Sequence, residues 1–216
     1  MMMADQSDFT LVPQRSPGAP KLIAIVGGSG SGKTWLAEKL ALALSPHAAR
    51  LSLDDFYRDR SHLSAACCAR VNFDHPRAID WPAVERALYD LLGNRATHVP
   101  CYDFATHSRL RRTRLLKPKP IILIDGLWLL HRPSLRRLFA LSIFLDCPAR
   151  TRLRRRLERD LQSRGRTRAS ILRQFHSMVE PMHKRYVASQ SQHADIVLTR
   201  SCGDREIQTL LRCLSA

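Results

Sequence analysis

The sequence of 216 residues has no apolar run near the roughly 18 residues that a membrane-spanning helix needs. Its six cysteines show no CxxC spacing and no histidines at metal-ligand intervals, which argues against zinc and suits a reducing cytosol. Residues 1–20 carry Asp5, Asp8 and three prolines but no signal-peptide stretch, so we expect a flexible leader on an untargeted, cytoplasmic protein. No internal repeat is present, and the length favours one domain over residues 21–216.

The charge is strongly basic and unevenly distributed. The formal net charge is +16, and the segment from Arg150 to Arg173 holds ten arginines against two acids. Such a cluster requires anionic partners, which are either the phosphates of a small ligand or those of a nucleic acid. The segment has no interleaved aromatic residues, and the chain shows no RRM, KH or helix-turn-helix pattern. The composition therefore favours a small ligand and no specific nucleic acid.

Short apolar segments alternate with segments of helical periodicity. Strands are predicted at 21–26, 50–53, 121–125, 141–146 and 195–199, and helices at 34–44, 81–92, 150–162, 169–187 and 204–214. Asp80 is the expected N-cap of the second helix, because Pro82 follows in its first turn. The alternation predicts an α/β fold with a parallel sheet covered by helices on both faces and a ligand site at the carboxyl ends of the strands. The Lys/Arg/Pro-rich residues 109–120 are predicted as a loop.

A phosphate-binding loop lies between the first predicted strand and the first predicted helix. The motif GxxxxGK[ST] is matched by Gly27, Gly28, Ser29, Gly30, Ser31, Gly32, Lys33 and Thr34. Its glycines let successive backbone N–H groups surround phosphate oxygens, and the helix N-terminus adds its dipole. We expect Lys33 to reach the β- and γ-phosphates and the Thr34 hydroxyl to bind Mg²⁺. The motif predicts NTP binding and leaves the phosphoryl acceptor open.

Three further segments concern the acceptor. Asp54 and Asp55 follow the second strand, where one carboxylate could accept the proton of an attacking hydroxyl and help to hold Mg²⁺. Alone, such a pair is more often a turn or a helix cap. Residues 72–80 (NFDHPRAID) and 99–109 (VPCYDFATHSR) are rich in aromatic rings, carboxylates and imidazole, a composition typical of sites for polar, planar ligands.

At these residues the sequence resembles the uridine kinase (uridine-cytidine kinase) branch of the phosphoribulokinase/uridine kinase family of P-loop kinases. The similarity runs from residue 21 to residue 200 through LDDFYRDRSHLS, NFDHPRAID, VPCYDFATHSR, RLRRRLERDLQSRGR, VEPMHKRY and ADIVLTR. The resemblance implies a nucleoside-binding insertion at about 55–115 and a helical lid at about 150–185. It also implies phosphoryl transfer from ATP or GTP to the 5′-hydroxyl of uridine or cytidine. Members are usually homotetramers with feedback inhibition by CTP and UTP.

The resemblance assigns roles by position. Asp54 matches the catalytic carboxylate, and Asp74 matches the carboxylate that binds the ribose hydroxyls. The remaining nucleoside-side matches are Tyr57, Phe73, Tyr102, His107, Arg156, Arg166 and Gln174, of which Tyr102 and His107 recognise the base. Arg159 and Arg164 match phosphate-binding lid arginines, and Arg159 is also expected to act in catalysis.

One position departs from the family pattern. The family usually has Glu-Gly at the end of the third strand, and this chain has Asp125-Gly126. The carboxylate is kept but is one methylene shorter, which favours a water-mediated contact to Mg²⁺ over a direct one.

The arginine-rich helix has its own periodicity. Leu153, Leu157 and Leu161 recur every four residues and predict a packing stripe, whereas Arg152, Arg156 and Arg159 are expected on another face. Gly165 should end this helix and let its flanking arginines, Arg164 and Arg166, move as a lid.

Two alternatives remain open. The first is a P-loop kinase of another small metabolite, such as a sugar phosphate or pantothenate; YDFATHSR argues against it, because base recognition would have no use there. The second is an ATP-responsive nucleic-acid-binding protein.

Overall fold

A computed structural model describes residues 18–64, 67, 71–104, 106–163, 165–199 and 203–215. Five parallel strands form the central sheet in the order β2-β5-β1-β6-β7. They are β1 (Lys21–Gly27), β2 (Ala48–Ser52), β5 (Ile121–Gly126), β6 (Phe139–Leu145) and β7 (Ile196–Leu198). All five predicted strands are confirmed. Their carboxyl ends share one edge of the sheet, and in the β2–β5 pair Ser52 lies opposite Asp125.

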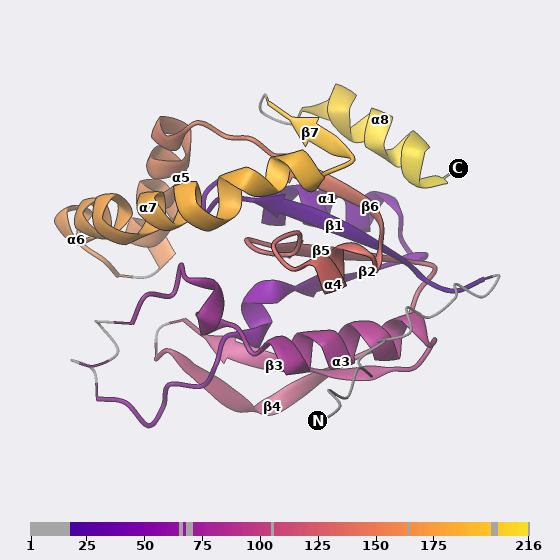
Figure 1. The fold of residues 1–216 in the computed structure, drawn as a ribbon, viewed down its shortest axis with the longest axis horizontal. Coiled ribbons are helices and arrows are strands. Elements are labelled where there is room, and N and C mark those ends of the chain that lie inside the picture. Colours follow the sequence, from indigo (N-terminus) through magenta and orange to yellow (C-terminus); the bar gives the residue numbers. More distant parts are fainter. Residues whose placement is uncertain are drawn as a thin grey trace, which may run out of the picture.

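Helices cover both faces of this sheet, as predicted. Helices α1 (Lys33–Ala43) and α8 (Asp204–Ser215) lie on one side, and α3 (Trp81–Leu92) lies on the other (Figure 1). Alternate residues of β1 serve the two layers: Leu22, Ala24 and Val26 join the core under α3, whereas Ile23 and Ile25 pack against α1 and α8. A strand buried on both faces is therefore apolar along its whole length.

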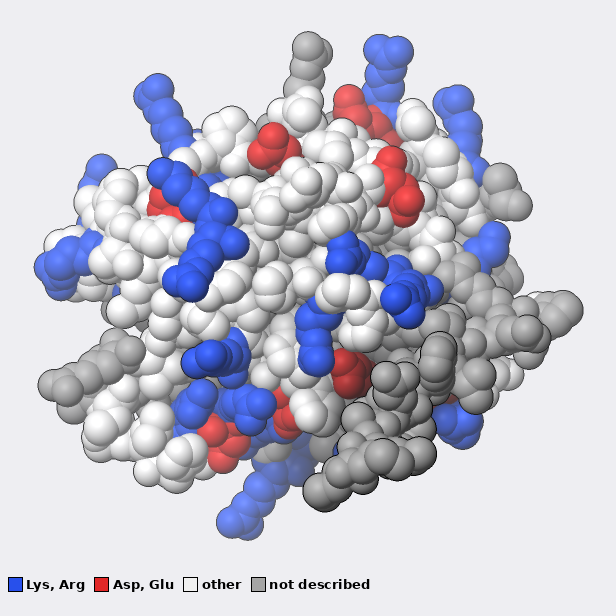
Figure 2. Space-filling view, in the orientation of Figure 1, with Lys and Arg blue, Asp and Glu red and all other residues white. Residues whose placement is uncertain are grey.

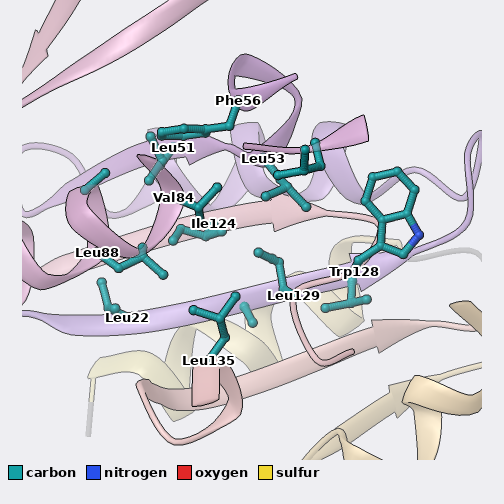
Figure 3. Close-up of a cluster of buried hydrophobic side chains, with 14 of the residues drawn as sticks. Leu22, Leu51, Leu53, Phe56, Val84, Leu88, Ile124, Trp128, Leu129 and Leu135 are labelled. Carbon is teal, nitrogen blue, oxygen red and sulfur yellow. The ribbon is translucent and has the colours of Figure 1, made fainter. Parts of the chain in front are cut away.

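The core beneath α3 supports the carboxyl edge of the sheet (Figure 3). Leu53 and Phe56, from the 3₁₀ helix η1 (Leu53–Phe56) that follows β2, are fully buried there together with Trp128. The Asp80 side chain accepts a hydrogen bond from the Ala83 N–H at 3.3 Å, which confirms the predicted cap of α3. A short 3₁₀ helix, η2 (Pro76–Ala78), precedes this cap, and α4 (Pro133–Arg136) follows β5.

A β-hairpin stands apart from the main sheet. It consists of β3 (Thr97–Asp103) and β4 (Ser108–Leu116), which pair antiparallel. The predicted loop at 109–120 is therefore wrong over most of its length. Residues 110–115 are solvent-exposed while their backbone groups pair with β3, so an arginine-rich composition is compatible with a strand at this position.

The helical region after β6 begins with α5 (Ala149–Ser163), and this helix ends, as predicted, before Gly165. The next helix, predicted at 169–187, is confirmed, but it is not uniformly α-helical. It runs through α6 (Arg168–Gln174), a π-helical stretch (Phe175–Val179), α7 (Glu180–Met182), a second π-helical stretch (His183–Val187) and a 3₁₀ turn (Ala188–His193). Pro181 lies inside this run and has no N–H to donate, which disfavours regular α-helical bonding around it. No helix of the described ranges combines the length and apolarity needed to cross a membrane.

The predicted leucine stripe of α5 is wrong. Arg152, Arg156 and Asp160 are the side chains that this helix buries, whereas Leu161 is 45% exposed. The reason is that α5 packs on polar backbone. The carbonyl oxygen of Arg152 lies so close to Gly30 that a Cβ on this glycine would be only 2.5 Å away. The Arg152 guanidinium donates to the Cys147 carbonyl at 3.0 Å and pairs with Glu180 at 2.6 Å, which gives the buried charge an acidic partner.

Candidate active site

The phosphate loop connects β1 to α1, where the sequence predicts it. Gly30 and Gly32 have φ angles of 84° and 99°, a left-handed conformation that side-chain-bearing residues rarely adopt. This conformation lets the loop turn back toward the N-terminus of α1. An anion seated here would meet backbone N–H groups and the positive end of the helix dipole.

Lys33 lies in the loop and is buried, with its Nζ 3.5 Å from the Gly28 carbonyl oxygen. Burial lowers the pKa of Lys33 from its ordinary value, and the nearby carboxylates of Asp54 and Asp125 act in the opposite direction. A phosphate beside this amine would supply the negative charge that favours its protonated form.

A chain of polar contacts joins the loop to the sheet. The Thr34 hydroxyl donates to Asp125 Oδ2 at 2.8 Å, and Arg50 pairs with Asp125 Oδ1 at 3.0 Å. Arg50 also pairs with Glu38 at 3.0 Å. Sequence reasoning missed Arg50, because its partner lies on a strand 75 residues away and only the β2–β5 pairing brings them together.

The residues predicted to bind metal are Thr34, Asp54 and Asp125. Hydroxyl and carboxylate oxygens are ligands that suit Mg²⁺. Within the described residues, no group of three His, Cys, Asp or Glu side chains could hold a metal alone. This donor set fits an ion that keeps waters and takes most of its ligands from a nucleotide's phosphates.

A cavity of about 760 Å³ opens beside the phosphate loop. It gathers residues from six segments of the sequence. Those predicted as site residues are Ser29, Lys33, Thr34, Asp54, Tyr57, Phe73, Asp74, Tyr102, His107, Arg156, Arg159, Arg166 and Gln174. The cavity is also lined by Val71, Asp103, Phe104 and Leu127, which sequence reasoning did not single out. Arg164 lies outside the described residues.

Aromatic rings form one wall of this cavity. Phe73 and His107 are stacked, with ring centroids 4.2 Å apart and an interplanar angle of 13°. Tyr57 contacts Tyr102 at 5.3 Å between centroids, and its hydroxyl donates to the Phe73 carbonyl at 3.1 Å. His107 has a φ of 53°, a strained value that is often found where function fixes a side chain.

Arginines from α5 and from the connection between α5 and α6 also line this cavity. Arg156 donates to Ser29 Oγ at 2.6 Å and to Gln174 Oε1 at 3.0 Å, and Arg166 also bonds Gln174. Arg159 pairs with Asp160 at 2.7 Å while lining the cavity. Arg156 thus contacts the phosphate loop through the Ser29 hydroxyl. Arg156 and Arg166 are joined through the side-chain amide of Gln174, to which both donate.

Arg109, on β4, holds the hairpin to the rest of the site. Its guanidinium donates to the Tyr57 carbonyl at 2.8 Å and to the Phe56 carbonyl at 3.2 Å, and it pairs with Asp80 at 3.0 Å. Sequence reasoning gave Arg109 no role, although it ends the YDFATHSR segment. These bonds fix the position of Tyr57 relative to the hairpin that carries Tyr102.

A second cavity, of about 390 Å³, lies on the other side of the phosphate loop. Ser31 and Gly32 border it, together with Trp35, which is 44% exposed. The end of β6, the loop after it, α5 and the end of β7 complete the lining, through Leu145, Asp146, Cys147, Pro148, Thr151, Arg155, Leu198 and Thr199. Arg155 donates to the Ser31 carbonyl at 2.8 Å, which fixes α5 against the loop. The phosphate loop therefore separates two cavities, as a kinase with a donor and an acceptor requires.

Comparison with known proteins agrees with this arrangement. Residues 22–207 match the Phosphoribulokinase / Uridine kinase family. The chain is 37% identical over 178 residues to a uridine kinase of Staphylococcus epidermidis, covering 82% of this chain and 86% of that protein. It is 35% identical over 180 residues to a uridine kinase of Clostridium perfringens, covering 83% and 86%. Among solved structures, the phosphoribulokinase from Rhodobacter spheroides has a TM-score of 0.63 and 16% identity, covering 84% of this chain and 70% of that one, which speaks for the fold alone.

Proposed function

Because the chain belongs to the phosphoribulokinase/uridine kinase family, we propose that it transfers the γ-phosphoryl group of ATP to the 5′-hydroxyl of uridine or cytidine, giving UMP or CMP. The observation that carries this proposal is the 760 Å³ cavity, which unites Lys33 and Thr34 with Asp54, Asp74 and His107. Phosphate-binding groups at one end and groups suited to a nucleoside at the other are what a nucleoside kinase needs.

On the donor side, the triphosphate lies along the phosphate loop, with Lys33 at its β- and γ-phosphates. The nucleoside part of the donor lies in the 390 Å³ cavity beside Trp35. Mg²⁺, when bound, neutralises charge on the β- and γ-phosphate oxygens. Thr34 and Asp54 would hold the ion, and Asp125, already bonded to Thr34, orients that hydroxyl and contacts the ion through water.

On the acceptor side, the Asp74 carboxylate accepts hydrogen bonds from the ribose 2′- and 3′-hydroxyls. The pyrimidine lies against the wall of Phe73, Tyr102 and His107. A neutral imidazole can donate or accept by tautomer, so His107 serves the 4-carbonyl of uracil or the 4-amino group of cytosine. Tyr102 leaves less room for a purine.

Asp54 acts where the two sides meet. It orients the 5′-hydroxyl and accepts its proton as the oxygen attacks the γ-phosphorus. Arg159 faces the same cavity and stabilises the negative charge on the transferring group, and Arg166 contributes to the nucleoside side. The buried position of the loop and the arginine cover limit access of water, which would otherwise compete as acceptor.

A substrate panel tests the proposal. ATP consumption is measured with uridine, cytidine, adenosine, pantothenate and ribulose 5-phosphate, and the products are identified by mass. We expect turnover with uridine and cytidine and at least about a hundredfold lower kcat/KM with adenosine. Preferential turnover of pantothenate or the sugar phosphate would instead support a kinase of another metabolite. Cytoplasmic location and a homo-oligomeric state belong to the same proposal and are tested by fractionation and light scattering.

A further inference from the structure

A third cavity, of about 510 Å³, lies outside the two described above. Its charged lining is basic: it is bordered by Arg58, Arg60, Arg77 and Arg132, with Pro76, Trp81 and His131 between them. Among the described residues, no aspartate or glutamate lines it. We refer to it as the arginine cavity. Like charges gathered around one hollow repel one another unless an anion lies between them.

The backbone holds two of these arginines in place. Tyr57 and Ile79 form an antiparallel bridge, and the N–H of Arg58 donates to the Ala78 carbonyl at 2.8 Å. Arg58 is further fixed by its Nε, which donates to the Ile79 carbonyl at 3.2 Å and leaves both terminal nitrogens of the fork for another acceptor. The side chain of Arg77, one residue before Ala78, is exposed.

The far wall has a different character. Arg132 pairs with Glu85 at 3.1 Å and lies 5.1 Å from the ring centroid of Trp81. The indole N–H of Trp81 is already bonded to the Pro76 carbonyl at 3.0 Å. One ring face is therefore occupied by a guanidinium, and the polar atom of the ring is satisfied. The cavity offers charge and forked donors rather than a stacking surface for a base.

The histidines nearby experience this positive charge. Burial lowers the pKa of His75, and Arg77 and Arg185 lower it further. Burial likewise lowers the pKa of His131, with Arg132 and Arg136 acting in the same direction.

Residues close to one another in the sequence line the arginine cavity and the 760 Å³ cavity. Tyr57, Asp74 and Leu127 line the 760 Å³ cavity. Arg58, Pro76 and His131, which follow them by one to four residues, line the arginine cavity. A ligand drawn toward Arg58 and Arg77 thus acts on the same short segments that carry Tyr57 and Asp74. Two sites that share segments can be linked in free energy.

We propose that the arginine cavity is a second anion site, which binds the phosphate groups of a small polyphosphate-bearing molecule and alters the affinity of the acceptor side. Guanidinium forks match phosphate oxygens in bidentate geometry, and this pairing is stronger than that of neutral hydrogen bonds. A nucleic acid is the less suitable occupant. On the face shown in Figure 2 the basic side chains occur in separate small groups with carboxylates between several of them, not as one continuous track.

Calorimetry of the full chain tests the site directly. The phosphate loop is first saturated with adenylyl imidodiphosphate and Mg²⁺, and inorganic triphosphate is then titrated at constant free Mg²⁺ and physiological salt. We expect one further site, with Arg58→Ala and Arg77→Ala each raising its Kd about tenfold or more. Arg212→Ala, on the exposed side of α8, removes the same charge and should change the Kd less than twofold. No further site, or equal weakening in all three variants, would overturn the proposal.

Kinetics test the linkage, a readout that rests on the proposed function. Saturating triphosphate should change the KM for uridine at least about threefold in the natural protein and leave it unchanged in Arg77→Ala. Binding without a change in KM would retain the site and overturn its coupling. If the protein does not phosphorylate uridine, the proposed function fails while calorimetry still decides on the site. Tighter, salt-resistant binding of a single-stranded RNA to the blocked protein, lost in Arg77→Ala, would overturn the small-ligand class.

Discussion

The Thr34 hydroxyl donates a hydrogen bond of 2.8 Å to Asp125 Oδ2, although 91 residues separate the two. The other carboxylate oxygen of Asp125 pairs with Arg50, and the side chain is 1% exposed. Both oxygens are thus engaged within the protein. Asp125 is therefore placed to orient the Thr34 hydroxyl, and Arg50 offsets the cost of burying its charge.

Asp125→Ala should raise the Mg²⁺ concentration for half-maximal activity about 10- to 100-fold, the range that follows loss of a residue supporting a metal ligand. Asp125→Asn keeps an acceptor for Thr34 and loses the ion pair with Arg50, so its effect should be intermediate. An Mg²⁺ titration of each variant measures this. Asp90→Ala, at a surface ion pair with Arg95, is the control. Superimposable curves for all four proteins would remove any metal-related role from Asp125.

Asp54→Asn should lower kcat about 10²- to 10⁴-fold and leave ATP binding nearly unchanged, because removing a general base costs this much while the phosphate loop stays intact. Asp55→Asn is the matched control. Asp55 is the next residue in the same turn but does not line the cavity, and its carboxylate lies 3.7 Å from Arg114. Single-turnover rates and nucleotide titrations separate the two effects. Equal loss in both variants would mean that the turn, rather than the Asp54 carboxylate, is what catalysis needs.

Asp55 should also make stability depend on pH. Burial raises the pKa of Asp55 to about 6, with Arg114 opposing and Asp54 adding to the shift. A carboxyl whose pKa rises on folding stabilises the protein below its unfolded pKa of about 4, and that stability is lost as pH rises through 6. The free energy of unfolding of Asp55→Asn, relative to that of the natural protein, should therefore be about 1 kcal/mol more favourable to the folded state at pH 7.5 than at pH 4, after allowance for partial exposure. Thermal unfolding of the variant and the natural protein at both pH values checks this prediction. A Tm difference between the two proteins that is the same at both pH values would contradict the pKa shift.

Trp35 should report on the donor. It borders the 390 Å³ cavity beside Gly32, and Lys39 lies 6.0 Å from its ring centroid. ATP should change the tryptophan emission of the protein, and Trp35→Ala should raise the KM for ATP about tenfold while changing that for uridine little, as loss of base stacking does. Leu42→Ala, 74% exposed on the same helix, is the control. An emission change that persists in Trp35→Ala would assign it to Trp81 or Trp128.

The five strands and the phosphate loop could be predicted because each depends on a local pattern. Residues 22–26 of β1 and 121–124 of β5 are apolar, since both faces of these strands are buried, and the glycine pattern marks the turn between β1 and α1. The hairpin strand β4 escaped prediction because residues 110–115 are exposed, so no alternation of apolar and polar residues marks it.

Contacts between residues that only the fold brings together could not be predicted from the sequence. The leucine spacing of α5 predicts an apolar contact, but this helix packs on the phosphate loop and buries Arg152 and Arg156 instead. Arg50 meets Asp125 only because β2 lies beside β5, an order that the chain sequence does not state. The acceptor-side residues were found through their resemblance to a family, and the structure gathers them in one cavity without testing their roles.

Arg159→Ala distinguishes a kinase lid from a basic surface. If Arg159 stabilises the transferring phosphoryl group, the substitution should lower kcat for uridine about 10²-fold or more and change ATP affinity far less, because the charge develops in the transition state. Arg154→Ala is the matched control on the same helix, since Arg154 is exposed and pairs with the neighbouring Glu158 at 2.7 Å.

The fold of the Arg159→Ala variant should be retained, because Asp160, the buried partner of Arg159, also lies 3.6 Å from Arg156 and does not become an isolated buried charge. Loss of turnover can then be assigned to chemistry once circular dichroism matches the natural protein. RNA binding at physiological salt is measured on the same two variants. In a nucleic-acid-binding protein, each arginine would contribute a similar, modest share of a salt-dependent affinity, so both substitutions would weaken RNA binding alike and neither would affect turnover. Unchanged kcat in Arg159→Ala together with tight RNA binding at physiological salt, weakened alike in both variants, would overturn the lid assignment.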